Sequence, residues 1–336
     1  MIISKTPYRI SFFGGGTDYP VWYQENGGAV LATTINKFCY ISCRYLPPFF
    51  EHKHRIVYSR IENVKSVEEV QHPAVRAALE FVKIDAGVEI HHDGDLPART
   101  GIGSSSSFTV GVLNCLYALK GIMSSKRRLA AEAIHIERNV LKENVGSQDQ
   151  ILAAMGGFNK VEFARNDDFT ITPVCVSKET LQQLNDHLML YFTGFSRTAS
   201  EVAKSKIQNI PNKKKELTVM HNMVDEALSI LNGDRCLVDF GKLLHETWKL
   251  KRSLSHNISN SHIDDIYSAA MGAGAIGGKL LGAGGGGFLL IFARPEDQPA
   301  IGKRLDKFLR VPFEFENQGS QIVVYQPDAN PHDSNA

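Results

Sequence analysis

The feature that most constrains this chain is the stretch Asp95–Gly111, DLPARTGIGSSSSFTVG. It begins with a turn, passes through Gly101 and Gly103, and presents four hydroxyls, Ser104–Ser107, before a helix-like apolar run. Glycines let the backbone come close to a ligand, and the unpaired N–H groups and dipole of a helix N-terminus favour an anion. The stretch therefore predicts a phosphate-binding loop. The alternative is a polar linker before a capped helix, because serine is an ordinary helix cap.

Two further glycine-rich stretches favour the phosphate-binding interpretation, FFGGGTDYP at residues 12–20 and GKLLGAGGGGFLLIF at residues 278–292. The second contains Gly282-x-Gly284-x-x-Gly287, which matches the dinucleotide-binding fingerprint, but a strand follows where that fingerprint requires a helix. A P-loop is excluded as well, because Ala273 stands in place of its first glycine and Leu280 in place of its serine or threonine. The sequence thus predicts neither a Rossmann nor a Walker site.

The composition limits the class of protein. A length of 336 residues predicts two domains, and 43% apolar with 22% charged residues is typical of a globular protein with a proper core. The 37 basic and 36 acidic residues nearly balance, which argues against nucleic acid as a partner. No apolar run reaches the roughly 18–20 residues of a membrane span, and the N-terminus lacks the pattern of a signal peptide. Five cysteines, an odd number, fit a reducing cytoplasm.

Hydrophobic periodicity predicts an α+β chain. In the first half we expect strands at 8–13, 29–35, 38–45, 55–58, 88–92, 158–163, 171–176 and 188–192, and helices at 67–82, 108–119, 126–142 and 148–155. In the second half we expect helices at 198–210, 217–231, 236–255, 263–270 and 296–309, a strand at 288–292, and one or two strands within 313–325. These patterns divide the chain into an N-terminal domain at 1–185, a C-terminal domain at 186–326 and a disordered tail at 327–336.

A phosphate-binding loop becomes part of a kinase when a metal, a base and a substrate pocket accompany it. Asp149, in the sequence GSQDQ at a helix start, is a candidate base, and a cation such as Arg9 would favour its ionised form. The alternative is a first-turn acid that complements the helix dipole. Asp18, in GGGTDYP, is a candidate acceptor for sugar hydroxyls or an ordinary turn aspartate.

Magnesium prefers hard oxygen ligands, usually a hydroxyl or carboxylate with phosphate oxygens and waters. Ser104 or Ser105 could supply the hydroxyl, and Glu137, on the second predicted helix, could supply the carboxylate. The alternative for Glu137 is an exposed helical acid beside Arg138. The sequence leaves both interpretations open.

The three glycine stretches resemble, in order and spacing, the three motifs of the GHMP kinases, a superfamily named for galacto-, homoserine, mevalonate and phosphomevalonate kinases. PYRISFFGGGTDY at residues 7–19 matches the first motif. Residues 97–106 match the second, P-x-x-x-G-L-G-S-S-A, with Ile102 in place of Leu and Ser106 in place of Ala. Residues 279–287 match the third. The resemblance implies an N-terminal domain like ribosomal protein S5 domain 2, a ferredoxin-like C-terminal domain, and ATP with Mg²⁺ between them.

The resemblance also implies roles for particular residues. It places the base on Asp149 with Arg9 in support, and the magnesium ligands on Glu137 and on Ser105, or on Ser104 if the loop register differs. The ATP phosphates are assigned to Pro97, Gly101, Gly103, Ser104, Ser105, Ser106 and Ser107. The sugar is assigned to Gly14, Gly15, Gly16, Thr17, Asp18, Arg197, Gly284 and Gly285.

The substrate is narrowed by details around the motifs. Galactokinases carry an acid and a histidine before T-D-Y, where this chain has Gly15 and Gly16, which argues against galactose. The triple glycine, GSQDQ, GGFN at 156–159 and YFTGFSR at 191–197 together resemble the D-glycero-D-manno-heptose 7-phosphate kinases. Those enzymes phosphorylate the anomeric hydroxyl and give the 1,7-bisphosphate for surface polysaccharide. The alternatives are a fucokinase- or galactokinase-type sugar 1-kinase and a non-catalytic nucleotide- or sugar-binding regulator.

A sugar 7-phosphate requires cations or helix N-termini. The sequence offers several candidate cations and does not choose among them: Arg99, Arg197, Lys249, Lys251 and Arg252. It also leaves the oligomeric state open, a homodimer included.

Overall fold

The structure is a computed structural model that describes residues 1–194, 199–234 and 236–327. It opens with two long antiparallel strands, β1 (Ile2–Phe13) and β2 (Gly28–Tyr45), joined through α1 (Pro20–Asn26). The two strands predicted at 29–35 and 38–45 are therefore one. The polar pair at 36–37 suggested a break, but it forms a bulge opposite the Pro7–Tyr8 step, and pairing resumes on either side.

The first sheet is antiparallel apart from one parallel pair and has nine strands in the described part of the chain. Its main path runs β13-β1-β2-β5-β3-β4, and β2 also pairs with β6 and with β12. The strands not yet bounded are β3 (His54–Val57), β4 (Ile61–Val64), β5 (Val88–Gly94), β6 (Phe158–Phe163), β7 (Phe169–Pro173), β12 (Phe315–Glu316) and β13 (Gln321–Tyr325).

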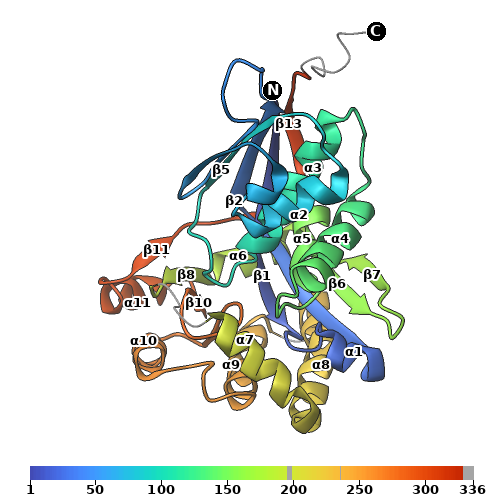
Figure 1. Cartoon of the computed structure of the whole chain (residues 1–336). Coiled ribbons are helices and arrows are strands. Elements are labelled where there is room, and N and C mark those ends of the chain that lie inside the picture. The colour runs from blue at the N-terminus through green and yellow to red at the C-terminus, as the bar shows by residue number, and fades with distance from the viewer. Residues whose placement is uncertain (195–198, 235, 328–336) are drawn as a thin grey trace.

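Helices α2 (Pro73–Val82), α3 (Ser104–Leu119), α4 (Lys126–His135) and α5 (Gln148–Met155) lie in front of this sheet (Figure 1). Helix α3 is buried from Ser106 to Leu119 and packs on both β1 and β2, so the end of the predicted phosphate-binding loop is anchored in the core. The stretch 67–82, for which the sequence predicts a helix with Pro73 at its start, forms a short 3₁₀ turn at Val67–Glu69 and then a helix that begins at Pro73. A proline fits the first turn of a helix and not its interior, which explains this start.

The second half of the chain builds a four-stranded antiparallel sheet in the order β11-β8-β10-β9. Its strands are β8 (Leu188–Phe192), β9 (Gly277–Leu280), β10 (Phe288–Phe292) and β11 (Leu309–Val311). The helices of this half are α6 (Lys178–Asp186), α7 (Ala199–Asn209), α8 (Lys214–Ser229), α9 (Val238–Ser253), α10 (Ser261–Gly272) and α11 (Gln298–Arg304), of which α9 and α10 contact β9. The α+β class is thus confirmed. The predicted helix 296–309 was too long, because residues 309–311 pair with β8 instead.

The two halves are interlocked. Strands β12 and β13, from the stretch assigned to the C-terminal domain, pair with β2 and β1 of the first sheet. Figure 1 shows β13 beside the N-terminus, at the end of the molecule opposite to α7, α8, α9 and α10. Helix α8 packs on β1 and β2, and α9 packs on β9 and β1. The region where the halves meet therefore lies along β1, which carries Arg9.

Two further predictions concern membrane-spanning helices and the C-terminal tail. None of the helices in the described part of the chain has the length and apolar character that crossing a membrane requires. Of the predicted tail, residues 328–336 lie outside the described residues.

Candidate active site

The phosphate loop, residues 101–107, leads directly into α3. Gly101 and Gly103 have φ angles of +83° and +77°, which favour glycine, and the helix begins at Ser104 rather than at the predicted 108. The backbone bond from Ser107 N–H to the Gly103 carbonyl, 2.9 Å, closes the first turn. The Ser107 hydroxyl donates to the carbonyl of Pro7 on β1 at 2.8 Å. The four serines therefore form the first turn of the helix.

The third glycine loop, residues 282–287, lies against the phosphate loop. A Cβ placed on Gly282 would lie 2.3 Å from the Gly101 Cα, and one on Gly287 would lie 2.2 Å from the Thr100 carbonyl oxygen. The Phe288 N–H donates to the same carbonyl at 3.1 Å. Two of the three glycine stretches are thus in direct backbone contact, as the shared-site hypothesis requires.

Arg9 and Asp149 form the central ion pair of the site. Arg9 is 4% exposed, and its Nε and Nη2 donate to the two carboxylate oxygens of Asp149 at 2.7 and 2.6 Å. Its Nη1 donates to the Gly101 carbonyl at 2.6 Å. A Cβ on Gly103 would lie 3.5 Å from Asp149 Oδ2. The guanidinium therefore fixes the carboxylate at the phosphate loop by a bidentate contact, and the two residues meet as the sequence predicted.

The loop at residues 14–18, which the resemblance assigns to the sugar and which we call the sugar loop, adjoins this pair. Asp18 is 2% exposed; its Oδ1 accepts from the Gly16 N–H at 2.8 Å and its Oδ2 from Gln148 Nε2 at 2.9 Å. Gln148 precedes Asp149, so Asp18 lies beside the candidate base. The Thr17 hydroxyl bonds within the fold, to the carbonyls of Gly14 and Ala29 at 2.8 and 2.9 Å. Sequence reasoning missed Gln148, although GSQDQ contained it.

Glu137 lies on a π-helical segment, Ile136–Val140, and is fully buried, so it is not an exposed helical acid. Its Oε2 accepts from the Ser106 hydroxyl at 2.9 Å and from Gln150 Nε2 at 2.5 Å. Its Oε1 has no hydrogen-bond partner among the described residues, and burial raises the pKa of the carboxyl to about 7. A buried carboxyl oxygen without a partner, next to a hydroxyl, fits a magnesium ligand set.

The hydroxyl that reaches Glu137 belongs to Ser106, whereas the resemblance implied Ser105 or Ser104. Ser105 is exposed, and the Ser104 Oγ accepts from the Arg99 N–H at 3.0 Å. The helix start at Ser104 explains the difference, because it turns the third serine, and not the second, toward the π-helical segment. Gly101 and Gly103, which the resemblance assigns to the ATP phosphates, lie in the turn before the helix.

Three lysines that come from the second half of the chain are buried in this region. Lys206, Lys251 and Lys279 are 4%, 4% and 3% exposed. Lys251 Nζ donates to the carbonyls of Leu280 and Gly282 at 2.6 and 2.7 Å, and Lys279 Nζ donates to that of Phe12 at 2.7 Å. Burial, followed by repulsion from the neighbouring cations, lowers the pKa of Lys279 to about 7 and that of Lys251 well below its usual value. Lys279 begins the third motif, but sequence reasoning assigned no role to it, and it missed Lys206.

The remaining candidates lie elsewhere or in other contacts. Lys249 pairs with Glu246 at 3.0 Å and Arg252 with Asp264 at 2.9 Å, both near the surface. Gly284 and Gly285 pack against Ile258: a Cβ on Gly284 would lie 2.7 Å from its carbonyl oxygen, to which the Gly285 N–H donates at 3.0 Å. Pro97 accepts a bond from Thr100 at 2.7 Å, which stabilises the turn before the phosphate loop. Arg197 lies outside the described residues.

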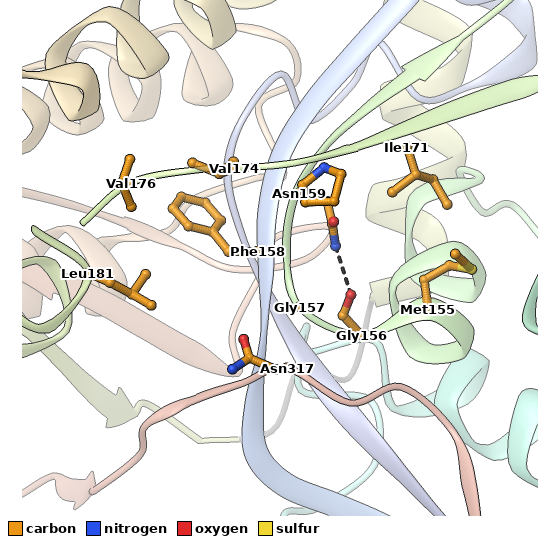
Figure 2. A pocket seen from close by; sticks show the side chains of 11 residues that line it. Met155, Gly156, Gly157, Phe158, Asn159, Ile171, Val174, Val176, Leu181 and Asn317 are labelled. Carbon is orange, nitrogen blue, oxygen red and sulfur yellow. Dashed lines mark hydrogen bonds between the residues drawn. The ribbon is translucent and has the colours of Figure 1, made fainter. Parts of the chain in front are cut away.

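The GGFN segment at residues 156–159 lines a cavity away from the phosphate loop. The cavity has a volume of about 400 Å³ and lies between the end of α5, β6, β7 and α6, where it is also lined by Met155, Ile171, Pro173, Val174, Val176, Leu181 and Asn317. Figure 2 shows the Asn159 amide turned back onto the Gly156 carbonyl, a bond of 2.8 Å. None of the residues assigned to catalysis, ATP or metal lines this cavity.

Comparison with known proteins finds two matching families. The family described as GHMP kinases N terminal domain matches residues 69–157, and the one described as GHMP kinases C terminal matches residues 224–311. The D-glycero-alpha-D-manno-heptose 7-phosphate kinase of Campylobacter jejuni is 29% identical over 320 residues, which cover 91% of this chain and 93% of that protein. The bifunctional fucokinase/GDP-fucose pyrophosphorylase of Arabidopsis thaliana is 26% identical over 328 residues, 88% of this chain but 30% of that longer protein.

Among solved structures, a D-glycero-D-manno-heptose 1-phosphate kinase from Bacteroides thetaiotaomicron superposes with a TM-score of 0.75. The match covers 97% of this chain and all of that one, at 24% identity. At this identity the likeness establishes a shared fold.

Proposed function

This chain belongs to the GHMP kinases and is an ATP-dependent sugar kinase, and we propose that its acceptor is D-glycero-D-manno-heptose 7-phosphate. The product would be the 1,7-bisphosphate, a precursor for surface polysaccharide. The observation that carries the proposed phosphoryl transfer is the ion pair of Arg9 and Asp149 beside the phosphate loop. The end-to-end match with the Campylobacter heptose 7-phosphate kinase supports this acceptor.

In the proposed reaction, the Asp149 carboxylate accepts the proton of the anomeric hydroxyl. The hydroxyl oxygen forms a bond to the γ-phosphorus of ATP, while the bond from that phosphorus to the β–γ bridging oxygen breaks and ADP leaves. Arg9 holds both carboxylate oxygens, so that the base keeps one orientation. Because Arg9 also bonds Gly101, it positions the base relative to the loop that would bind the transferred phosphate.

The phosphate loop supplies the N–H groups and helix dipole for the triphosphate. Ser106 and Glu137 would hold Mg²⁺, which neutralises negative charge on the phosphate oxygens when bound. On the sugar side, Asp18 is buried beside the base and is held by Gly16 and Gln148, so its remaining acceptor capacity is available for a hydroxyl. Cysteines that form no disulfide support a cytoplasmic location, where ATP is present.

The test is a screen in which ATP consumption is coupled to each of five acceptors: D-glycero-D-manno-heptose 7-phosphate, galactose, fucose, mannose and mevalonate. We expect heptose 7-phosphate to give the highest kcat/KM, with the new phosphate on the anomeric carbon by ³¹P NMR. Turnover of fucose with none of heptose 7-phosphate would contradict the proposal. It would favour an L-fucose 1-kinase, the alternative that the similarity to the fucokinases supports.

A further inference from the structure

The centre of the site holds more buried basic side chains than carboxylates. Four cations that are at most 4% exposed surround the Asp18 and Asp149 carboxylates: Arg9, Lys206, Lys251 and Lys279. The basic groups outnumber the carboxylates, and the lowered pKa values of Lys251 and Lys279 let these amines lose their protons when no ligand is bound. A bound anion would favour their protonated form, so the cluster suits an anionic ligand.

Three of the four cations already have polar partners in the protein. Arg9 pairs with Asp149, Lys251 donates to two backbone carbonyls, and Lys279 donates to one. Lys206 differs from them, because its ammonium has no hydrogen bond or ion pair with any described residue. Its recorded contact is with the ring of Tyr19, 4.9 Å from the ring centroid. Lys206 is therefore the cation that remains available to a ligand.

Lys206 lies at the sugar loop. A Cβ placed on Gly16 would lie 3.5 Å from the Lys206 Nζ, and the Gly16 N–H is bonded to Asp18. Tyr19, whose ring the ammonium faces, follows Asp18 directly. By contrast, the atoms near the phosphate loop belong to Arg9, Asp149 and the third glycine loop. The position of Lys206 therefore suits an anion on the sugar rather than the triphosphate of ATP.

Keeping this lysine charged and buried is unfavourable for the ligand-free fold. Burial lowers the pKa of Lys206, and the carboxylates of Asp18 and Asp149 offset this only in part. A residue that opposes stability in this way is typical of a functional site. A phosphate beside Lys206 would favour the charged form of its ammonium, because lysine binds phosphate as a compact point charge.

We infer that Lys206 is a specificity residue, which binds the phosphate group carried by the acceptor sugar. The inference rests on the proposed function, since it names the group that recognises a phosphorylated acceptor. Helix α7 brings Lys206 from the second half of the chain onto the sugar loop, so the acceptor phosphate would contact both halves of the molecule.

The test is Lys206→Met, which removes the charge and keeps most of the length of the side chain. Steady-state kinetics with heptose 7-phosphate should show KM raised about 10- to 100-fold, the range expected for a lost hydrogen bond to a charged group. We expect kcat within about threefold of the wild type and an unchanged KM for ATP, because uniform binding of the acceptor is lost. Lys206→Arg, which keeps the charge, should recover part of the loss.

The matched control is Lys204→Met on the same helix, because Lys204 is exposed. It should leave every kinetic constant unchanged. Thermal unfolding gives a second measurement: without ligand, Lys206→Met should be at least as stable as the wild type, but heptose 7-phosphate should no longer stabilise it. A lysine with a merely structural role would give the opposite result, a less stable variant that still responds to the ligand.

Three outcomes would overturn the inference: a fall in kcat at unchanged KM, which would place Lys206 at the transferred phosphate; unchanged kinetics; or equal loss in Lys204→Met. If the wild type turned over no sugar phosphate, the proposed function would fail by itself. Inorganic phosphate would then decide the inference, which requires that phosphate stabilises the wild type against heat and does not stabilise Lys206→Met.

Discussion

The charged side chains of the site have different kinds of partner in the two halves of the molecule. On the side of the first sheet, Arg9 and Asp149 pair with each other, and Asp18 and Glu137 each accept two hydrogen bonds. On the side of the second half, the lysines donate to backbone carbonyls or, in the case of Lys206, to no described group. The Asp149 carboxylate is thus held in place by the protein alone, whereas the lysine side has basic groups that an anionic ligand would contact.

This difference suggests that the two sides contribute to different steps, one to turnover and the other to the binding of anions. Groups that are already paired are preorganised and need no rearrangement during the reaction. Buried charged groups that remain unpaired contribute to the binding of a ligand. In the ligand-free protein they lower the free energy of unfolding. We therefore expect substitutions on the paired side to affect mainly turnover and those on the lysine side to affect mainly the binding of anions.

The largest effect is expected for Asp149→Asn, which removes the proposed base and leaves its shape. Turnover should fall about 10²- to 10⁴-fold, the contribution typical of general base catalysis. Binding of a fluorescent ATP analogue should persist, because the phosphate loop is unchanged. Asp265→Asn, at an exposed position on α10, is the control and should behave as wild type. If Asp149→Asn turned over substrate at the rate of the parent, the base would have to be another group.

The next largest effect is expected for Glu137→Gln, which tests the carboxylate proposed to hold magnesium. The Mg²⁺ concentration for half-maximal activity should rise at least about 10- to 100-fold. Even the loss of a residue that only hydrogen-bonds to a metal ligand lowers metal affinity by this factor. The magnesium titration should be run at saturating ATP. An unchanged Mg²⁺ requirement would remove Glu137 from the metal site.

The same variant makes a prediction about pH. Folding raises the pKa of Glu137 from 4.5 to about 7, so the folded state holds its proton to higher pH than the unfolded chain does. The free energy of unfolding of the wild type should therefore fall as pH rises between those values, by on the order of 3 kcal/mol at most. Without magnesium, Glu137→Gln should lack this fall. Urea unfolding at pH 5 and pH 8 measures it, and parallel curves for the two proteins would contradict it.

The contact between the two halves is tested by Gly282→Ala. The new Cβ would lie 2.3 Å from the Gly101 Cα, and the φ angle of +67° is unfavourable for alanine. We expect a loss of about 2–4 kcal/mol in the free energy of unfolding. Gly121→Ala has a similar φ of +70° but no heavy atom within 4 Å, so it isolates the backbone term of about 1 kcal/mol. Equal losses in the two variants would show that the loops do not need this close contact.

Sequence reasoning succeeded where the signal was local. The bounds of α5, β6, β8 and β10 agree with the predicted ones, because each is a short apolar segment flanked by glycine, polar or charged residues. The contact between Arg9 and Asp149 was also predicted, since both residues lie in motifs whose order and spacing suggested a shared site. Their chemical roles stay proposals.

Sequence reasoning failed where the signal was nonlocal. Lys206 lies in an ordinary helix and Lys279 at the start of the third motif, but the burial of both depends on how the two halves pack. The return of β12 and β13 to the first sheet pairs residues that lie about 280 to 320 positions apart in the chain, which no local pattern encodes. The phosphate loop lies between these cases: its composition predicted a helix start, but not which serine would face Glu137.

The identity of the serine that contacts Glu137 can be tested with the smallest expected effect. Ser106→Ala removes the hydroxyl that donates to Glu137 at 2.9 Å, whereas Ser105→Ala removes an exposed hydroxyl on the same turn. If Ser106 is the magnesium hydroxyl, its variant should lose about 10-fold in kcat/KM, the size of one hydrogen bond to a charged group. Ser105→Ala should then stay within about twofold of the wild type. The opposite ranking would mean that binding of ATP turns the loop by one residue, as the family motif implies, and that the contact between Ser106 and Glu137 belongs to the ligand-free protein.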